Sequence, residues 1–578
     1  NVYAGFGSPF KMEPFRPGPI SMVSQSGGFG YSMASLAEEV GLGFCKIMSI
    51  GNEAGLSSMD FMHYFVEDPG TKIIVGYIEG LRDAYRLLEV GSAALRQRKP
   101  ILIWKMGKTE VGQKAAASHT GNLAGENALY EAAFKQKGMI QVDDLQDLVD
   151  YSKAFLYGKH PRGNRVAVVS ASGGAGVVLA DQCAQSGFEL PPLTEASIAK
   201  LRELLPSFSS LLNPIDATPS LFNRPTGNTT LRQVLQILLD DPNVDSLIVS
   251  NSSVHGVLAT AIAKEIVELD RVTDKPVFVS WSARASLAAD AYRLLAEANI
   301  PFYQTPVRCG RSLGVLSKFA EACRREEVER SAPVLVLERP AARGALRTKR
   351  GYVSEHEAKR MLLEYGIDIT QEELAGNKRD ARLIAARIGY PVAIKVQSPD
   401  IPHKTEAGAV RLDIASDQEL ERAYDEVLEN AKRHAPQARI EGVLVQAMVK
   451  DAVEVILGVV NNSQFGSAIM FGLGGIFTEV LKDVSFRLAP VTRSIAMEMI
   501  REIRGYPILR GARSSGIADV EALADTITKL SAMAIDLRNE IEELDINPLF
   551  VFAEHKGVKA GDALIKLYTM PISATAEI

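Results

Sequence analysis

The chain has 578 residues, of which 46% are hydrophobic and 23% charged, so its composition is that of a globular protein, and its length predicts about three to four domains. Its 64 basic and 70 acidic residues give a formal charge of −6, which supports neither nucleic acid nor an anionic membrane as a partner. No apolar run reaches the roughly 18 residues of a membrane-spanning helix, and the 4 cysteines lack the spacing of a zinc site or a disulfide framework. We therefore expect a cytoplasmic protein with reduced thiols.

A short apolar strand, a Ser/Gly turn and a helix occur twice in the first half of the chain. Residues 19–30 contain Ser-Gln-Ser-Gly-Gly-Phe-Gly, and residues 165–176 contain Ser-Ala-Ser-Gly-Gly-Ala-Gly at a constant offset of 146 positions, which predicts two related domains. In each copy the glycines let the backbone approach a ligand, and the helix N-terminus favours an anion such as phosphate. A single copy would equally fit a tight turn. The residues expected at the phosphate are Ser24, Ser26, Gly27, Gly28, Ser172, Gly173 and Gly174.

Both copies continue as alternating strands and helices, which is the pattern of a doubly wound parallel sheet. In the first copy Glu79 directly follows a strand, which places its carboxylate at the C-terminal edge of the sheet, where open α/β sheets bind ligands. A solvated charge at the end of a strand is the simpler alternative. The expected strands are 46–49, 72–78, 100–104, 166–170, 246–250, 276–280 and 301–303, and the expected helices of the first copy are 31–40, 59–65, 85–98 and 126–137.

One histidine, His119, lies among small residues in the stretch 115–125. An imidazole is largely neutral at cellular pH, so it can act as a nucleophile, and the small neighbours leave room for a phosphoryl group. On this stretch alone, a loop histidine that fixes a turn is the simpler interpretation. Because the stretch follows another strand of the same sheet, we expect Glu79 and His119 to meet at one edge. There the carboxylate would hold the imidazole in one tautomer and favour its cationic form.

The last third of the chain carries a different set of charged and polar residues. A lysine within an apolar strand is costly to bury unless it meets an anion, so Lys395 predicts a phosphate partner. A loop of turn residues after this strand contains His403, and Arg487 is expected to be a further outward-pointing cation. Near the end, Asn547 and Asp562 provide hard oxygen ligands suited to Mg²⁺ carried with nucleotide phosphates, although Asn547-Pro by itself could be only a turn.

Together these motifs resemble those of one family, the nucleoside-diphosphate-forming acyl-CoA synthetases, which are relatives of succinyl-CoA synthetase. Ser-His119-Thr-Gly-Asn-Leu-Ala-Gly resembles the phosphohistidine loop of that family, and Tyr-Ile-Glu79-Gly resembles its partner glutamate. Ile-Lys395-Val, Pro-His403-Lys-Thr and Asp-Ile-Asn547-Pro-Leu resemble its ATP-grasp segments. The resemblance covers essentially the whole chain.

The resemblance implies an α/β fold in which two tandem flavodoxin-like, doubly wound domains of the succinyl-CoA synthetase type precede an ATP-grasp domain, as in fused single-chain members. Members normally begin with a Rossmann-like CoA-binding domain. No such domain precedes Asn1, so we expect that it was cut away or lost, which puts CoA binding by this chain alone in question. The composition of 324–349, rich in Arg, Glu, Pro and Ala, predicts a linker. The expected domains are 1–158 with the phosphohistidine loop, 159–335 and 350–578, with the linker at 336–349.

The resemblance also implies roles for individual residues. The two helix N-termini would face one phosphohistidine from opposite sides, and His403 would relay phosphate between the nucleotide and His119. Family members often have an acidic residue in the nucleotide hinge where this chain has Gln446, so the nucleotide preference stays open. The implied nucleotide-binding residues are Lys395, Gln446, Glu454 on the ribose side and Arg487, and the implied Mg²⁺ ligands are Asn547 and Asp562.

The expected function is the synthesis of acyl-CoA, ADP and phosphate from a carboxylic acid, CoA and ATP, with His119, Glu79 and His403 as catalytic residues and with phosphohistidine and acyl-phosphate intermediates. One alternative is a catalytically silent acyl-CoA or nucleotide sensor, which would be expected to lose the loop histidine. Another is an ATP-grasp carboxylate–amine ligase, which leaves the tandem Ser/Gly turns without a role. Fused members are commonly dimers, so we expect a homodimer that binds small molecules and neither nucleic acid nor membrane. The carboxylic acid has no signature in the sequence.

Overall fold

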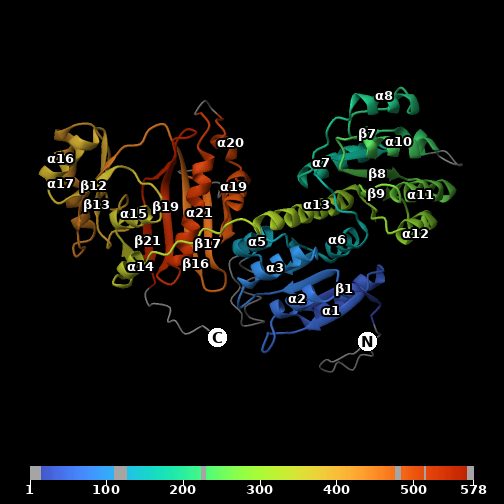
Figure 1. Ribbon diagram of the computed structural model, residues 1–578, viewed down its shortest axis with the longest axis horizontal. Helices are drawn as coiled ribbons and strands as arrows, with labels where there is room; N and C mark the ends of the chain where they lie inside the picture. Colours follow the sequence, from blue (N-terminus) through green and yellow to red (C-terminus); the bar gives the residue numbers. More distant parts are fainter. Residues whose placement is uncertain (1–14, 110–126, 223–228, 475–482, 513–515, 569–578) are drawn as a thin grey trace. The chain divides into compact units, whose positions relative to one another are not determined.

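The computed structural model describes residues 15–109, 127–222, 229–474, 483–512 and 516–568. The chain divides into two compact units with hydrophobic cores of their own (Figure 1). Within the part of the chain that is described, no helix combines the length and the apolar character needed to cross a membrane. The N-terminal unit is drawn from 1–81, 86–124 and 137–328, and the C-terminal unit from 82–85, 125–136 and 329–578.

The first domain is built on a parallel five-stranded sheet with the strand order β2-β1-β3-β4-β5. The direction of winding reverses between β1 and β3, and doubly wound sheets bind ligands in the crevice at such a point. All six residues of β3 are buried, as expected for a central strand of a parallel sheet, and the strand therefore appears in the sequence as a continuous apolar run. The elements are β1 (Pro17–Ser24), α1 (Gly27–Glu39), β2 (Phe44–Ser49), α2 (Ser58–Glu67), β3 (Ile73–Ile78), α3 (Arg86–Arg96), β4 (Ile101–Lys105), β5 (Ile140–Gln141) and α6 (Leu145–Tyr157).

The second domain repeats this topology with the strand order β10-β9-β8-β6-β7. The registers correspond as well, because Ser24 of β1 lies beside Tyr77 of β3, and Ser170 of β6 lies beside Ser250 of β8. The prediction of two flavodoxin-like domains is therefore confirmed. The elements are β6 (Val166–Ser170), α7 (Gly173–Gln185), α8 (Glu195–Leu204), β7 (Ile215–Asp216), α9 (Thr218–Phe222), α10 (Thr229–Asp240), β8 (Ser246–Ser252), α11 (Gly256–Asp270), β9 (Val277–Ser282), α12 (Ala289–Glu297) and β10 (Phe302–Tyr303).

One long helix, α13 (Pro306–Glu329), packs into the cores of both N-terminal domains (Figure 1). Its Phe319 lies in the core of the first domain, whereas its Cys309 lies in a core of the second. Residues 324–329, which the composition placed in a linker, are part of this helix. The prediction failed there because one of the charged residues that suggest a linker, Glu326, is buried and paired with Arg96 and Lys137 of the first domain.

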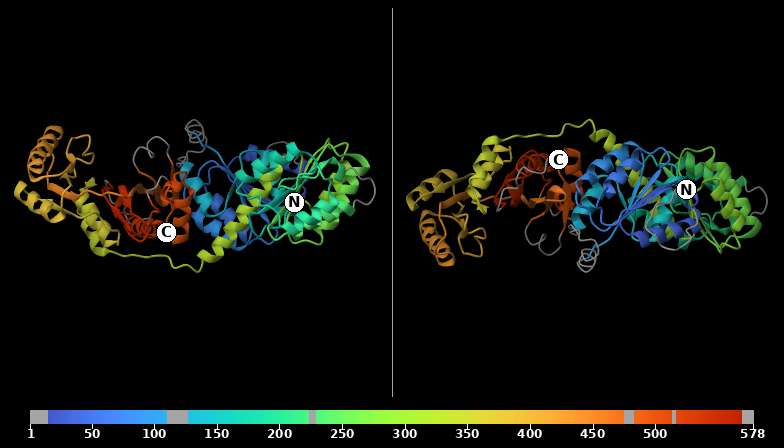
Figure 2. Two further views of the ribbon diagram at one scale, coloured as in Figure 1. Left: turned by 90° about the horizontal axis from the view of Figure 1, so that it is seen from above. Right: turned by 90° about the horizontal axis from the view of Figure 1, so that it is seen from below.

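The C-terminal unit contains a seven-stranded antiparallel sheet in the order β11-β21-β19-β16-β17-β18, with β20 paired to β19, and a four-stranded sheet in the order β12-β15-β13-β14. The smaller sheet forms a lobe with α16 and α17 beside the larger sheet (Figure 2). The strands are β11 (Tyr352–Val353), β12 (Glu372–Ala375), β13 (Val392–Gln397), β14 (Val410–Ile414), β15 (Gly442–Ala447), β16 (Val453–Asn462), β17 (Gly466–Leu473), β18 (Val484–Leu488), β19 (Ile541–Val551), β20 (Val558–Ala560) and β21 (Leu564–Leu567). The helices are α14 (Pro340–Arg347), α15 (Glu355–Glu364), α16 (Lys378–Ile388), α17 (Asp417–His434), α19 (Arg493–Glu502), α20 (Tyr506–Leu509) and α21 (Val520–Asp536).

The helix α5 (Asn127–Gln136) lies between β4 and β5 of the first domain in sequence but belongs to the C-terminal unit. Its Gln136 pairs with the backbone of Leu488 on β18, the outermost strand of the larger sheet. The side-chain Nε2 donates to the Leu488 carbonyl and the side-chain Oε1 accepts from the Leu488 N–H, both at 3.0 Å. The amide thus satisfies backbone groups that an edge strand would otherwise leave unpaired. Tyr130 of the same helix packs edge-on against Phe465.

The predicted linker 336–349 contains α14, so that part of the prediction is wrong. A proline in the first turn starts the helix, and the apolar side chains of Ala342 and Leu346 lie in the core of the C-terminal unit. A linker was predicted because the segment is rich in Arg and Ala, and only two of its residues, Ala342 and Leu346, are buried in the helix.

The buried position of Leu346 leads to a stability prediction. Leu346→Ala should lower the free energy of unfolding by about 2–5 kcal/mol, because it opens a cavity in a packed core. Leu335→Ala, the same change at an exposed position in the preceding segment, should cost less than about 0.5 kcal/mol. Urea denaturation followed by circular dichroism measures both. Equal effects would show that α14 does not dock in the core.

Candidate active site

One buried serine hydroxyl holds the turn between β1 and α1. Ser24 Oγ donates to the carbonyl of Ser26 at 2.7 Å and accepts from its N–H at 3.2 Å. A Cβ on Gly30 would lie 2.6 Å from Ser24 Oγ, so the close approach of the helix to the strand requires glycine at that position. The predicted phosphate ligand Ser24 therefore uses its hydroxyl to shape the turn.

The N-terminus of α1 is open. Ser26 is the N-cap residue, but its side chain makes no capping hydrogen bond, and the first turn contains no acidic residue. The next two residues, Gly27 and Gly28, are exposed. Uncapped N–H groups at a helix start carry roughly half a positive charge, so this terminus suits an anion, as the sequence predicted.

The equivalent end of α7 differs in one respect. Its N-cap residue Ser172 likewise makes no side-chain cap, and Gly173 and Gly174 are exposed. However, a carboxylate oxygen of Asp216 lies 2.9 Å from the position that a Cβ on Gly173 would take, whereas the corresponding neighbour of α1 is the hydroxyl of Ser49. A negative charge at this point opposes the binding of an anion. The constant offset of the repeat does not extend to Asp216, so the sequence alone did not reveal this difference.

Glu79 directly follows β3 at the carboxyl edge of the first sheet, as predicted. Its Oε2 is buried and has no hydrogen-bond partner among the described residues. Its backbone N–H donates to the side chain of Gln25 and its carbonyl accepts from the ammonium of Lys105, two residues that the sequence did not single out. The predicted partner His119 belongs to 110–126, which lies outside the described residues, so the meeting of Glu79 and His119 stays a prediction.

The predicted phosphate ligand Lys395 lies at the centre of a buried cluster of charges in the C-terminal unit. Its Nζ donates to Glu355 at 2.7 Å, to Asp562 at 2.9 Å and to the carbonyl of Gly561 at 3.2 Å. The ammonium groups of Lys359 and Lys404 also contact Glu355, at 2.9 and 3.2 Å. The structure thus brings Lys395 together with the predicted metal ligand Asp562.

These contacts decide the charge states in the cluster. Burial alone would raise the pKa of Glu355, but the ammonium groups of Lys395, Lys359 and Lys404 hold it well below its usual range. Burial alone would lower the pKa of Lys395, but Glu355 and Asp562 raise it above its usual value. Lys395 is therefore a fixed cation. The sequence did not predict the role of Glu355, because two of its three lysine partners, Lys395 and Lys404, come from another strand and another loop.

The remaining predicted residues of the nucleotide region lie around this cluster. Gln446 on β15 is buried, and its Nε2 donates to Thr370 at 2.6 Å and to the carbonyl of Gly561 at 2.7 Å, so it holds the loop that carries Asp562. Glu454 on β16 is exposed. His403 is exposed in the loop after β13, and the next residue, Lys404, anchors this loop to Glu355.

The expectation that Arg487 points outward is wrong. Arg487 of β18 pairs in register with Ile469, whose side chain lies in the core covered by α19 and α21. Its guanidinium contacts Glu502 of α19 at 2.7 Å, and only 1% of the side chain is exposed. Asn547 follows the core residue Ile546 on β19, so it faces the opposite side of the sheet. The structure therefore does not bring Arg487 together with the metal ligands.

The residues predicted to hold Mg²⁺ come from β19, which carries Asn547, and from the loop after its partner strand β20, which carries Asp562. Asp545, which the sequence did not single out, lies on the same side of β19 as Asn547. Burial, together with the charge of Asp562, raises the pKa of Asp545 to about 6. Two neighbouring carboxylates and an amide oxygen fit a hard divalent cation. Among the described residues there is no cluster of three or more His, Cys, Asp or Glu side chains with metal-site geometry, so these groups would share the ion with nucleotide phosphates and water.

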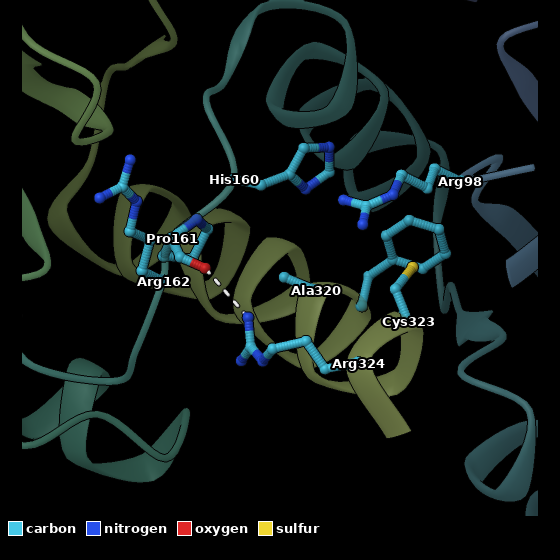
Figure 3. A pocket seen from close by; sticks show the side chains of 8 residues that line it. Arg98, His160, Pro161, Arg162, Ala320, Cys323 and Arg324 are labelled. Atoms are coloured by element: carbon cyan, nitrogen blue, oxygen red, sulfur yellow. Dashed lines mark hydrogen bonds between the residues drawn. The ribbon is translucent and has the colours of Figure 1, made fainter. Parts of the chain in front are cut away.

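A cavity of about 260 Å³ lies elsewhere in the N-terminal unit (Figure 3). Its arginines are engaged with protein groups, since Arg98 contacts Glu327 at 2.9 Å and Arg324 donates to the carbonyl of Pro161 at 3.3 Å. Burial, with a further contribution from Arg98, lowers the pKa of His160, which also lines the cavity. The cavity contains none of the predicted site residues and is not the candidate active site.

Models of three protein families match the chain. The succinyl-CoA ligase-like flavodoxin domain matches residues 17–155, the ligase-CoA domain matches 166–325 and the ATP-grasp domain matches 344–567. These matches agree with the predicted order of the domains.

Known proteins are similar over nearly the whole chain. Acetate–CoA ligase (ADP-forming) I of Archaeoglobus fulgidus is 38% identical over 541 residues, which cover 93% of this chain and 76% of that protein. The 4-hydroxybutyrate–CoA ligase (ADP-forming) of Nitrosopumilus maritimus is 33% identical over 562 residues, with coverage of 96% and 78%. The solved structure of dinucleotide-forming acetyl-coenzyme A synthetase 1 from Ca. Korarchaeum cryptofilum in complex with phosphate and ADP is 32% identical and aligns with a TM-score of 0.50, covering 55% of this chain and 68% of that chain.

The buried charge cluster leads to a second prediction. Glu355→Gln should destabilise the protein by about 3–5 kcal/mol, because it leaves the ammonium groups of Lys359, Lys395 and Lys404 without their shared counter-charge. Glu357→Gln, the same change two residues along α15 in a half-exposed ion pair, should cost no more than about 1 kcal/mol. Thermal unfolding measured by calorimetry compares the two variants. Similar unfolding temperatures would contradict the assigned role of Glu355.

Proposed function

Because this chain belongs to the ADP-forming acyl-CoA synthetases, we propose that it converts a carboxylic acid, CoA and ATP into acyl-CoA, ADP and phosphate through phosphohistidine and acyl-phosphate intermediates. It is an acid–thiol ligase, and its substrates CoA and nucleotide are small molecules. One observation supports the phosphoryl-transfer role most directly. The carboxyl edge of the first sheet combines an uncapped helix N-terminus with the carboxylate of Glu79, whose buried Oε2 lacks a partner among the described residues.

His119 is the proposed covalent nucleophile. A ring nitrogen forms a bond to phosphorus as the bond from phosphorus to the previous carrier breaks, and that carrier is His403, which takes the γ-phosphoryl group from ATP and releases ADP. Glu79 accepts a hydrogen bond from the other ring nitrogen of His119 and stabilises the cationic ring. The substrate carboxylate then takes the phosphoryl group, and the CoA thiol displaces phosphate from the acyl phosphate. The N–H groups at the start of α1 stabilise the phosphoryl charge before and during transfer.

The nucleotide end of the reaction is assigned to the C-terminal unit. Lys395, held as a cation by Glu355 and Asp562, meets the nucleotide phosphates, and Glu454 lies on the ribose side. Gln446 supports the site by fixing the loop before Asp562. Mg²⁺ would be held by Asn547 and Asp562, and when bound it neutralises part of the phosphate charge.

We further propose that the protein works as a homodimer in the cytoplasm. The resemblance to fused members, which are commonly dimers, supports the oligomeric state. The buried thiols of Cys183, Cys309 and Cys323 are unpaired, as is typical of a reducing compartment. Light scattering on the purified protein determines the oligomeric state.

The role of His119 leads to a third prediction. Incubation with ATP labelled at the γ-phosphate and with Mg²⁺ should label the wild type with an acid-labile phosphoryl group. When a carboxylic acid and CoA are then added, His119→Ala should release the label as phosphate at least tenfold more slowly than the wild type, because its label can only be on the relay histidine His403. His160→Ala serves as the matched control and should label like the wild type. Release of the label from His119→Ala at the wild-type rate would refute the role, and a wild type that binds ADP without labelling would favour the silent sensor.

The acid substrate leads to a fourth prediction. Two of the similar proteins are named for acetate and for 4-hydroxybutyrate, so a screen of small carboxylic acids should include both, together with an aryl acid such as ferulate. At least one acid should stimulate CoA-dependent ADP release by tenfold or more over the reaction without acid, in an assay coupled to ADP. The full-length gene product should be used. ADP release that needs an amine in place of CoA would indicate a carboxylate–amine ligase.

A further inference from the structure

Two buried side chains hold the backbone of Glu79 from both sides. The Oε1 of Gln25 accepts from the N–H of Glu79 at 2.6 Å and from the N–H of Gly80 at 3.2 Å, and its Nε2 donates to the Gly80 carbonyl at 2.7 Å. The Nζ of Lys105 donates to the carbonyl of Glu79 at 2.8 Å. Both peptide groups that flank the Glu79 side chain are therefore fixed, which restricts the directions in which its carboxylate can point.

Each of these two side chains is itself anchored. Gln25 Nε2 also donates to Glu53 Oε1 at 2.8 Å, and the same oxygen accepts from the N–H and the hydroxyl of Ser58, at 2.9 and 2.5 Å. Lys105, the last residue of β4, is 1% exposed and also donates to the carbonyl of Met106. The positions of Gln25 and Lys105 are thus determined by the first residues of α2 and by the end of β4.

The second domain has the same fold without these two side chains. The N–H of Gln25 bonds to Tyr77, and the N–H of Ala171, at the repeat offset, makes the equivalent bond to Ser250. Lys105 pairs in register with the last residue of β3, and the residue at the same place on β9 is Trp281. The second sheet forms with Ala171 and Trp281 at these two positions. The fold itself therefore does not require side chains such as Gln25 and Lys105 that bond to the backbone after the central strand.

A lysine elsewhere in the same domain shows what a purely structural role looks like. Lys99, at the other end of β4, donates to the carbonyls of Phe65, Val66 and Asp68, at 3.3, 2.6 and 2.7 Å. It ties the end of α2 to the sheet, far along the strand from the carboxyl edge. Lys99 and Lys105 therefore use the same kind of hydrogen bond at opposite ends of one strand, and only Lys105 contacts the candidate catalytic glutamate.

We propose that Gln25 and Lys105 are positioning residues, which hold Glu79 in the orientation that orders the phosphorylated histidine. The inference rests on the proposed function, because it takes Glu79 to be the partner of His119. Gln25 fixes the N–H side of Glu79, and Lys105 fixes its carbonyl side and adds a positive charge beside it.

The charge of Lys105 provides an independent measurement. Burial lowers its pKa to about 8, although the Glu79 carboxylate acts in the opposite direction and Lys108 adds to the lowering. Glu53, on the far side of the Gln25 amide, is the other carboxylate in this network. The ammonium of Lys105 therefore loses its charge as the pH rises through about 8, whereas an arginine at this position would keep its charge.

The test measures the rate at which label from ATP and Mg²⁺ reaches His119, as distinct from His403, in the wild type, Lys105→Met, Gln25→Ala and the control Lys99→Met. Lys105→Met and Gln25→Ala should slow labelling at least tenfold, with the dissociation constant for ADP changed less than twofold. Lys99→Met should lower the unfolding temperature but leave the labelling rate within twofold of the wild type. Lys105→Arg should restore part of the rate and move the alkaline midpoint of the labelling rate above its wild-type value.

The outcomes separate the two levels of the proposal. If the wild type takes no label, the proposed function fails, and the positioning role fails with it. If the wild type takes label and both Lys105→Met and Gln25→Ala label at the wild-type rate, the positioning role alone is overturned. An equal loss of rate in Lys99→Met would also overturn it, since the effect would then follow stability. If Lys105→Met does not fold, Gln25→Ala decides, because alanine occupies the equivalent position of the second domain.

Discussion

In both N-terminal domains, one buried serine hydroxyl turns the first strand into the first helix. Ser24 and Ser170 each satisfy the N–H and the carbonyl of the residue two positions on, so neither group needs water or another partner. Because the turn supplies its own hydrogen bonds, it can be short, and the helix starts at the carboxyl edge of the sheet with its N–H groups directed away from the strand. The turn therefore leaves a helix N-terminus at the carboxyl edge of the sheet, the edge that Glu79 also occupies.

The C-terminal unit holds its predicted phosphate ligand Lys395 in another kind of arrangement. Three lysines gather around a buried carboxylate, Glu355. A buried ion cluster of this kind adds little net stability, because the loss of hydration offsets most of the attraction. The cluster keeps Lys395 charged and fixed at a buried position, where burial alone would favour the neutral form of lysine. Asp562 completes the arrangement by joining the cation to the loop that Gln446 holds in place.

The sequence predicted those features that depend on neighbouring residues or on repetition. The order of the three domains, the duplication and the strand carrying Glu79 were readable because apolar runs and Ser/Gly turns are local signals. Gln25 and Lys105 were not, since they act on Glu79 from 54 and 26 positions away. The direction of the Arg487 side chain could not be predicted either. Successive side chains of β18 point to opposite faces of the sheet, but the sequence does not show which face α19 covers. The linker prediction was wrong at Leu346 for a related reason. Ala342 and Leu346 stabilise a helix here because they pack into the core of the C-terminal unit, and the local sequence does not show that core.

The two N-terminal domains share a turn but differ in the side chains beside it, and this difference sets the local charge at each helix start. The start of α1 has the neutral Ser49 as its neighbour, and the carboxylate of Glu79 and the ammonium of Lys105 lie at the same sheet edge. The start of α7 has the carboxylate of Asp216 within reach of its first glycine. Since a helix terminus carries only about half a charge, a carboxylate beside it opposes the binding of phosphate there. The duplicated turn therefore provides two helix starts of one shape with different charges beside them.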